Sequence, residues 1–391
     1  MRTIYLDHAA STPLRTEVLQ AMLPYLEGAY GNPSSLHHKG REAERALRHA
    51  RAKVAALLAV APDEVVFTGS GTEANNLALL GTAEARSSRG RHVLVSPIEH
   101  PSVLSPAEAL ARAGFDVEYL PVDAYGRIDA GDAYGRVRPD TILVSVMYAN
   151  NEIGTVEPIA ELGELLAALP ETARPLLHTD ACQALGQLPI SPVDLHVDLM
   201  SLNSAKAYGP KGVGMLYVRT GVRLAPRQLG GSHERGLRAG TENLAGIVGF
   251  SSALELAIPR AHETARRLSS LRNEFIGMVR RLVPSATVNG HPTERLPNNV
   301  HLSVPYIEGE SLLLLLDTYG ICAATGSACS AHDLAPSHVL RAIGQSDELI
   351  HGSLRLSFGD ETTRDDLAYV AEALAASVRR LTSVSPLPLH V

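Results

Sequence analysis

Short apolar runs rich in β-branched residues recur along the first 220 residues, and stretches with helical periodicity separate most of them. Helical spacing is clear at 41–58 and at 158–169. This alternation predicts an α/β protein with a mainly parallel central sheet and helices on both faces. The predicted strands are 65–69, 92–97, 116–122, 141–149, 176–181, 198–205 and 214–219.

The pattern changes at about residue 259, where a long charged helix over 259–283 begins. Strands and helices of a smaller α/β unit follow it. A chain of 391 residues is long enough for about two domains. We therefore expect a large domain over 15–258 and a small C-terminal domain over 259–391, joined by the N-terminal segment 1–14.

The composition narrows the kind of ligand. The three cysteines are odd in number and have no paired spacing, which argues against a disulfide framework and a metal site. The formal charge of −7 and the absence of a Lys/Arg run argue against nucleic acid. No run approaches the ~20 apolar residues that cross a bilayer, and no signal-peptide pattern opens the sequence. We expect a cytoplasmic protein that acts on a small molecule.

Polar residues follow several predicted strands, at the sheet edge where ligands bind in open parallel sheets. Gly71 and Thr72 stand between a strand and a helical pattern, which suits a phosphate seat but is more often a turn and a helix cap. His100 and Asn151 follow two further strands, and each is ambiguous alone. The edge is thus a candidate site that needs further residues to define it.

Asp180 and Lys206 supply those residues. An acid at one strand end and a lysine at the next would most often form a salt bridge. A lysine between an apolar strand and a Gly-Pro turn, however, is held at the sheet edge, which favours Schiff-base chemistry. Pyridoxal phosphate requires a lysine, an acid for its ring nitrogen, an anion seat and a ring-stacking group. Candidates for all four occur in register with the predicted sheet.

Further motifs are spread over nearly the whole length of the chain: YLDHAASTP, GNPSSLH, FTGSGTEANNLA, IEHPSV, NNEIGTVEPI, HTDACQALG, KAYGPKGVGMLYVR, GGSHERGLRAGTEN, ATGSACSAH, SHVLRAIG and SLRLSFGDETT. With these motifs the sequence resembles the pyridoxal-phosphate-dependent cysteine desulfurases of fold type I. The resemblance implies a homodimer that removes sulfur from L-cysteine, giving L-alanine and an enzyme persulfide.

The resemblance gives roles to the residues around the cofactor ring. Lys206 would hold the cofactor covalently, and Asp180 would pair with its ring nitrogen. Gln183 would bond the phenolic oxygen, and His100 would stack on the ring and relay protons. Asn151 would lie beside the ring and the substrate carboxylate.

A second group would hold the phosphate and the substrate. Arg355 would clamp the substrate carboxylate in a bidentate geometry that Lys cannot provide, and Asn32 would join that pocket. Thr241 would reach the cofactor phosphate of the neighbouring subunit. The residues expected to bind phosphate within the chain are Gly71, Thr72, Asn203 and Ser204.

The chain departs from the family pattern just before the lysine. The family commonly has Ser at position 203 and His at position 205, whereas this chain has Asn203, Ser204 and Ala205. Asn203 and Ser204 can donate hydrogen bonds to phosphate, but Ala205 cannot. We therefore expect one fewer side-chain donor and weaker retention of the cofactor.

Cys329 stands among small and polar residues in the stretch GSACSAHD, 326–333. By resemblance it is the nucleophile that takes the substrate sulfur. Its small neighbours predict a mobile loop, in which bulky residues at Ala328 or Ser330 slow turnover more than they weaken folding. Cys182 and Cys322 are expected to pack in the core.

Two alternatives and one partner remain open. The chain could be a selenocysteine lyase or related aminotransferase with the same cofactor, or a non-catalytic partner protein that keeps the fold. If it is a desulfurase, the persulfide must pass to an acceptor, such as an iron–sulfur scaffold or a sulfur carrier. His8 and His233 are expected near the entrance of the site.

Overall fold

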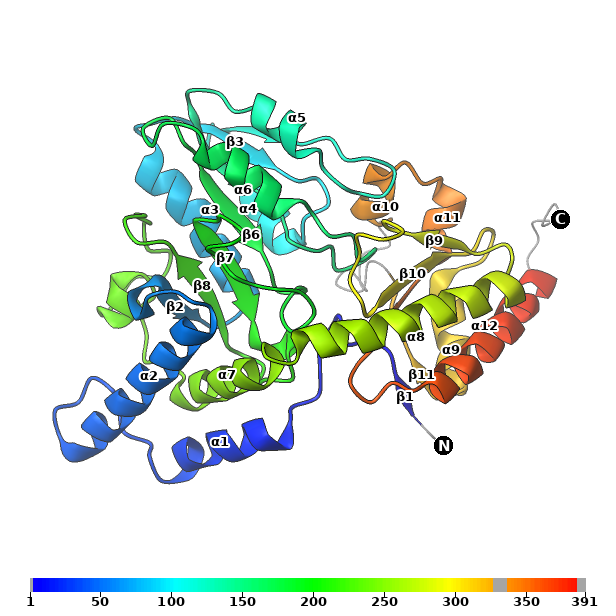
Figure 1. The fold of residues 1–391 in the computed structure, drawn as a ribbon, viewed down its shortest axis with the longest axis horizontal. Coiled ribbons are helices and arrows are strands. Elements are labelled where there is room, and N and C mark those ends of the chain that lie inside the picture. The colour runs from blue at the N-terminus through cyan, green and yellow to red at the C-terminus, as the bar shows by residue number, and fades with distance from the viewer. Residues whose placement is uncertain (1–2, 326–335, 385–391) are drawn as a thin grey trace.

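The computed structural model describes residues 3–325 and 336–384. Its main element is a seven-stranded sheet with the strand order β2-β8-β7-β6-β5-β3-β4 (Figure 1). All seven predicted strands are confirmed, and each ends earlier than predicted. The strands are β2 (Val65–Thr68), β3 (His92–Val95), β4 (Asp116–Tyr119), β5 (Thr141–Ser145), β6 (Leu176–Asp180), β7 (Leu199–Asn203) and β8 (Gly214–Val218).

Strands β4, β3, β5, β6 and β7 run parallel, and β8 is antiparallel to both of its neighbours. The sheet is therefore mainly parallel, as predicted. The carboxyl ends of β3, β5, β6 and β7 meet at one edge, because parallel strands all end on the same side. This edge brings together residues that are far apart in the sequence.

Helices cover both faces of this sheet. Val65 and Phe67 of β2 pack in one apolar cluster, whereas Val66 between them packs in another, because successive side chains of a strand point to opposite faces. The first cluster includes α2, α6 and α7, and the second includes α3 and α4. The helices of this part are α1 (Thr16–Glu27), α2 (His38–Leu57), α3 (Gly71–Arg86), α4 (Pro101–Arg112), α5 (Ala130–Gly135), α6 (Ile159–Ala167) and α7 (Leu244–Ala257).

The long charged helix predicted over 259–283 is confirmed as α8, which opens a second part of the chain (Figure 1). This part contains an antiparallel sheet in the order β12-β10-β9 and a parallel pair, β1 and β11. Its elements are β1 (Ile4–Tyr5), α8 (Ala261–Leu282), β9 (Thr287–Asn289), β10 (Asn299–Ser303), α9 (Gly309–Thr318), β11 (Ile321–Cys322), α10 (His338–Ala342), α11 (Asp347–His351), β12 (Ser353–Ser357) and α12 (Arg364–Val384).

The N-terminal segment belongs to both parts. Ile4 and Leu6 pack in the apolar cluster that also holds Phe275 and Phe358 of the second part. From there the chain crosses to α1, which lies beside α7 (Figure 1). These separate cores support the proposed division near residue 259 with a joining segment at 1–14, and that division stays a prediction.

Within residues 3–325 and 336–384, no single helix is long and apolar enough to cross a membrane. Helices α7 and α8, which meet at a bend of 68°, reach the necessary length and apolarity only as a pair. No group of three or more His, Cys, Asp or Glu side chains in the same ranges is placed to hold a metal ion. The cytoplasmic location and the absence of a metal stay predictions of the sequence.

Candidate functional site

A cavity of about 250 Å³ lies at the carboxyl edge of the seven-stranded sheet. Residues of the seven-stranded sheet and its loops, of the three-stranded sheet and of the N-terminal segment line it. Three separate regions of the sequence therefore contribute to the cavity. The lining residues are Ala9, Ala10, Gly71, Thr72, His100, Ser102, Met147, Asn151, Asp180, Cys182, Gln183, Asn203, Lys206 and Arg355.

Lys206 lies at the end of β7, in the short 3₁₀ turn η2 (Ser204–Lys206). Its Nζ donates to the backbone oxygens of Ala9 at 2.7 Å and Ala10 at 2.6 Å. Gln183 Nε2 donates to the same oxygen of Ala9 at 2.9 Å. The N-terminal segment thus positions the predicted lysine and the predicted glutamine against one wall of the cavity.

Asp180 is the last residue of β6 and is 7% exposed. Its Oδ1 accepts from the backbone N–H of Cys182 at 2.9 Å, and its Oδ2 accepts from Asn75 Nδ2 at 2.6 Å. Both oxygens of the carboxylate are therefore fixed in direction, as an acid that must meet one ring nitrogen requires.

His100 precedes α4 and caps it, because its Nδ1 accepts from the backbone N–H of Ser102 at 3.1 Å. Burial lowers the pKa of His100, and Lys206 and His338 lower it further, whereas Asp180 raises it. The net direction is downward, so the neutral imidazole is favoured near neutral pH.

The N-terminus of α3 forms another part of the cavity wall. Ser70 caps this helix by accepting from the backbone N–H of Glu73 at 3.1 Å, while Gly71 and Thr72 line the cavity. A Cβ atom on Gly71 would lie 2.7 Å from Sγ of Cys182 and 3.4 Å from Cβ of Asn203. Because Gly71 has no side chain, it leaves room for an anion to approach the N–H groups at the start of the helix. The side chains of Thr72 and Asn203 line the same part of the cavity.

Arg355, from β12 of the three-stranded sheet, completes the cavity and is 4% exposed. Its Nη1 donates to the backbone oxygen of Asn151 at 3.0 Å, and its Nη2 donates to Asp7 Oδ1 at 2.8 Å. Its Nε is buried without a hydrogen-bond partner among the described residues. A buried guanidinium with a remaining donor suits a carboxylate ligand.

The structure does not bring every predicted residue to this cavity. Ser204 is fully buried, and its hydroxyl lies directly against Gly209 and not along the cavity wall. Asn32 and Thr241 are exposed and line none of it within their own chain. Cys329, with Ala328 and Ser330, lies outside the described residues.

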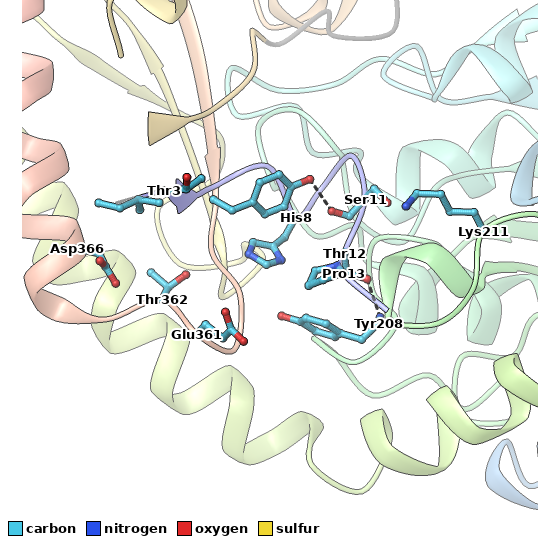
Figure 2. A pocket seen from close by; sticks show the side chains of 12 residues that line it. Thr3, His8, Ser11, Thr12, Pro13, Tyr208, Lys211, Glu361, Thr362 and Asp366 are labelled. Atoms are coloured by element: carbon cyan, nitrogen blue, oxygen red, sulfur yellow. Dashed lines mark hydrogen bonds between the residues drawn. The ribbon is translucent and has the colours of Figure 1, made fainter. Parts of the chain in front are cut away.

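A larger cavity of about 590 Å³ lies beside the N-terminal segment (Figure 2). His8, Ser11 and Tyr208 are among its lining residues, so His8 lines this cavity and not the first one. His233 lines neither. Although this second cavity is larger, Lys206, Asp180 and Arg355 do not line it, and we therefore take the smaller one as the candidate active site.

The strand-end reasoning did not identify several residues of the site. Ala9 and Ala10 act through backbone oxygens, which carry no side-chain signal in a sequence. Ser102 is the second residue of α4, and nothing in the pattern distinguishes it from a helix-capping serine. Cys182, which the sequence predicts to pack in the core, is 8% exposed and also lines the cavity. Its position two residues after Asp180 was the available signal.

The residues of this cavity fit pyridoxal phosphate. The lining includes an acid with fixed oxygens, a lysine, and a histidine whose pKa is lowered by burial. It also includes Gly71 at the N-terminus of α3, with Thr72 and Asn203. This set of groups matches a ligand that has both a ring with a basic nitrogen and a phosphate.

Comparisons with known proteins agree with this geometry. The model of the class-V aminotransferase family matches residues 4–370. Cysteine desulfurase IscS of Dictyoglomus turgidum is 47% identical over 385 residues, which are 98% of this chain and 97% of that protein.

Two solved structures resemble the fold. A NifS-like protein is 36% identical with a TM-score of 0.90, and the match covers 97% of this chain and 100% of that one. SspA in complex with cysteine is 34% identical with a TM-score of 0.79, covering 91% and 99%. With the family match over most of its length, this chain belongs to the class-V aminotransferase family.

Proposed function

We propose that this chain is a cysteine desulfurase that uses pyridoxal phosphate to transfer the sulfur of L-cysteine to Cys329, with release of L-alanine. The observation that carries the proposal is the meeting of Lys206, Asp180 and Arg355 in one cavity of about 250 Å³. The similarity to a cysteine desulfurase over 98% of the chain, and to a protein solved with cysteine, supports the same substrate.

Side chains from two strand ends and one helix would hold the cofactor. Lys206 would bind it through Nζ, and Asp180 would pair with its ring nitrogen. Gly71, Thr72 and Asn203 would bind its phosphate. When bound, pyridoxal phosphate supplies an electron sink that weakens the bonds at the α-carbon of an amino acid.

The chain's own residues would then orient the substrate and move its protons. Arg355 would bind the substrate carboxylate through two N–H groups, so that the α-carbon faces Lys206. Lys206 would take the α-proton at Nζ. His100 would relay protons to and from the substrate within the buried site.

Sulfur transfer requires a thiolate, and we assign this role to Cys329. Its thiolate would form an S–S bond with the substrate sulfur while the Cβ–S bond of the substrate breaks. The electron pair of the broken bond stays with the three-carbon fragment, which would take up one proton at Cβ, regain a proton at the α-carbon from Lys206, and leave as L-alanine. The products are one alanine and one persulfide for each cysteine consumed.

The persulfide would pass to an acceptor protein for iron–sulfur cluster assembly or thiolation, and the chain would act as a homodimer in the cytoplasm.

Burial raises the pKa of the Cys182 thiol well above its ordinary value, so this second thiol of the site stays protonated. A protonated thiol is a weak nucleophile, which leaves the transfer to Cys329.

The test is to add L-cysteine to the purified protein, quantify alanine, and locate added sulfur by peptide mass spectrometry. We expect sulfur on the Cys329 peptide, and we expect C329S to lose both products. The control is C322S, which removes a partly buried thiol outside the candidate site.

Added sulfur on Cys182 or Cys322 instead of Cys329 would overturn the assignment. Alanine release that persists in C329S with selenocysteine, but not with cysteine, would indicate a selenocysteine lyase. A protein that shows no spectral response to cysteine when loaded with the cofactor would be non-catalytic.

A further inference from the structure

A continuous chain of hydrogen bonds joins Asp180 to His100 through two residues to which no role has been assigned. Asn75, on α3, donates from Nδ2 to Asp180 Oδ2 at 2.6 Å and to Ser102 Oγ at 2.8 Å. Ser102 Oγ lies 2.8 Å from His100 Nδ1. Asn75 is 1% exposed and Ser102 is 7% exposed, so water does not interrupt the chain at either residue.

In this series of hydrogen bonds, each donor and each acceptor can be assigned in one way only. A carboxylate accepts hydrogen bonds and cannot donate, so Asn75 must present its NH₂ group to Asp180. Its second N–H then points to Ser102 Oγ, which accepts. The hydroxyl proton of Ser102 is thereby left to donate to His100 Nδ1.

A second donor reaches the same nitrogen. The backbone N–H of Ser102 donates to His100 Nδ1 at 3.1 Å, as part of the cap of α4. With two donors, Nδ1 must carry its lone pair, and the proton of the neutral imidazole must be on Nε2. The partial positive charge at the N-terminus of α4 also disfavours the imidazolium form.

We propose that Asn75 and Ser102 are positioning residues that hold His100 as the neutral tautomer protonated on Nε2. The Asp180 carboxylate, which can only accept, fixes the direction of the hydrogen bonds between them. This inference deepens the proposed function and rests on it, since it makes His100 a proton donor at Nε2 in its resting state. The same carboxylate would thus orient the cofactor ring and define the proton on the histidine beside it.

Charged groups on three other elements face His100 and enter any titration of it. Asp180 at the end of β6 raises its pKa, whereas Lys206 in η2 and His338 in α10 lower it. Glu99 directly precedes His100 and is fully buried, and burial raises the pKa of its carboxyl well above the ordinary value. A substitution at Ser102 leaves these groups in place, whereas a substitution at Asn75 also removes a hydrogen bond from Asp180.

The test uses nitrogen-15 NMR of histidine-labelled protein without cofactor, with H100Q to assign the signal. We expect wild-type His100 to show a protonated Nε2 and an unprotonated Nδ1. In S102A and N75A we expect its pKa to rise by about half to one unit, because each change weakens a hydrogen bond to the neutral ring. S251A is the matched control, as Ser251 is also buried but has no side-chain hydrogen bond among the described residues.

A wild-type His100 protonated on Nδ1 would overturn the proposal, as would variants that titrate like S251A. S102T, which keeps the hydroxyl, should restore the wild-type titration. In the loaded enzyme, N75A and S102A should lower kcat with little change in KM. The NMR result does not depend on turnover, so it separates a wrong tautomer from a wrong substrate.

Discussion

At the scale of single residues, Arg355 shows how a side chain is prepared for its ligand. The guanidinium is buried between the Asn151 backbone oxygen and Asp7, so its plane is fixed before a substrate arrives. A lysine at this position would offer a point charge without the planar pair of donors. Recognition of the substrate carboxylate should therefore depend on Arg specifically and not on positive charge alone.

We expect Arg355→Lys to raise KM for L-cysteine by about tenfold or more, since one of two charge-assisted hydrogen bonds is lost. Steady-state kinetics per mole of cofactor-loaded protein measures this. Arg272→Lys is the matched control, because Arg272 is a buried arginine that donates to the Leu296 backbone oxygen outside the cavity. An unchanged KM in Arg355→Lys would exclude the clamp.

The residues that sequence reasoning found share one property. Asp180 ends β6, Lys206 and His100 lie in the segments that follow β7 and β3, and the topology of a parallel sheet brings such positions to one edge. Asn75 and Ser102 are different, because their contacts depend on how α3 and α4 pack against each other. Packing of that kind leaves no spacing signal in a single sequence.

Ser204 shows a related limit. Its residue type suits a phosphate donor, but the 3₁₀ turn at Ser204–Lys206 directs its hydroxyl toward Gly209. A sequence gives the identity of a side chain at a turn and not its direction, which the local backbone dihedrals decide.

At the scale of elements, α10 connects the second part of the chain to the active-site loops. Ser337, its N-cap, donates from Oγ to Glu152 Oε2 at 2.6 Å. His338 Nε2 lies 2.9 Å from the backbone oxygen of Glu99. Val339 and Leu340 pack in an apolar cluster with residues of the large sheet's loops, including Ile98. The helix thus contacts both the His100 loop and the Asn151 loop.

Glu152 gives this contact a pH dependence. Burial raises its pKa to about 7, while the Ser337 hydrogen bond and Arg355 act in the opposite direction. The ordinary value is 4.5, so between these values the folded protein binds more protons than the unfolded chain. The stability from this group is fully present below pH 4.5 and is lost as pH rises through about 7.

We therefore expect Glu152→Gln to gain stability relative to wild type as pH rises from 5 to 8, by on the order of 3 kcal/mol at most. Glutamine keeps an acceptor for Ser337 but cannot ionise. Urea unfolding of both proteins at the two pH values measures the difference. Glu161→Gln, at an exposed position on α6, should show no such trend. A constant difference between Glu152→Gln and wild type would contradict the expectation.

At the scale of the whole molecule, the candidate site is complete only when three regions meet. Lys206 and Asp180 come from the seven-stranded sheet, Arg355 comes from the three-stranded sheet, and Ala9 and Ala10 come from the N-terminal segment. The alternation of strands and helices predicted the first of these regions. The sequence also predicts a joining segment at 1–14, but the backbone contacts of Ala9 and Ala10 with Lys206 have no periodicity that would reveal them in the sequence.

Thr241 extends this argument to a second copy of the chain. It is exposed and absent from its own chain's cavity, and the family resemblance assigns it to the neighbour's cofactor phosphate. We expect Thr241→Val homodimers to lose cofactor faster on dialysis than wild type. Lys206→Ala homodimers should hold no covalently bound cofactor. If Thr241 binds the neighbour's cofactor phosphate, Lys206 and Thr241 of one site come from different subunits.

Mixed dimers of these two variants separate the possibilities. If Thr241 serves the neighbour, one site combines Lys206 from one subunit with Thr241 from the other, and its cofactor should be retained as in wild type. If Thr241 serves its own chain, each site of the mixed dimer lacks one of the two residues and neither recovers. Absorbance of the bound cofactor after dialysis, measured on dimers purified through two different tags, decides between them. Recovery at one of the two sites would establish that the dimer is the functional unit, because neither chain alone then contains a complete phosphate seat.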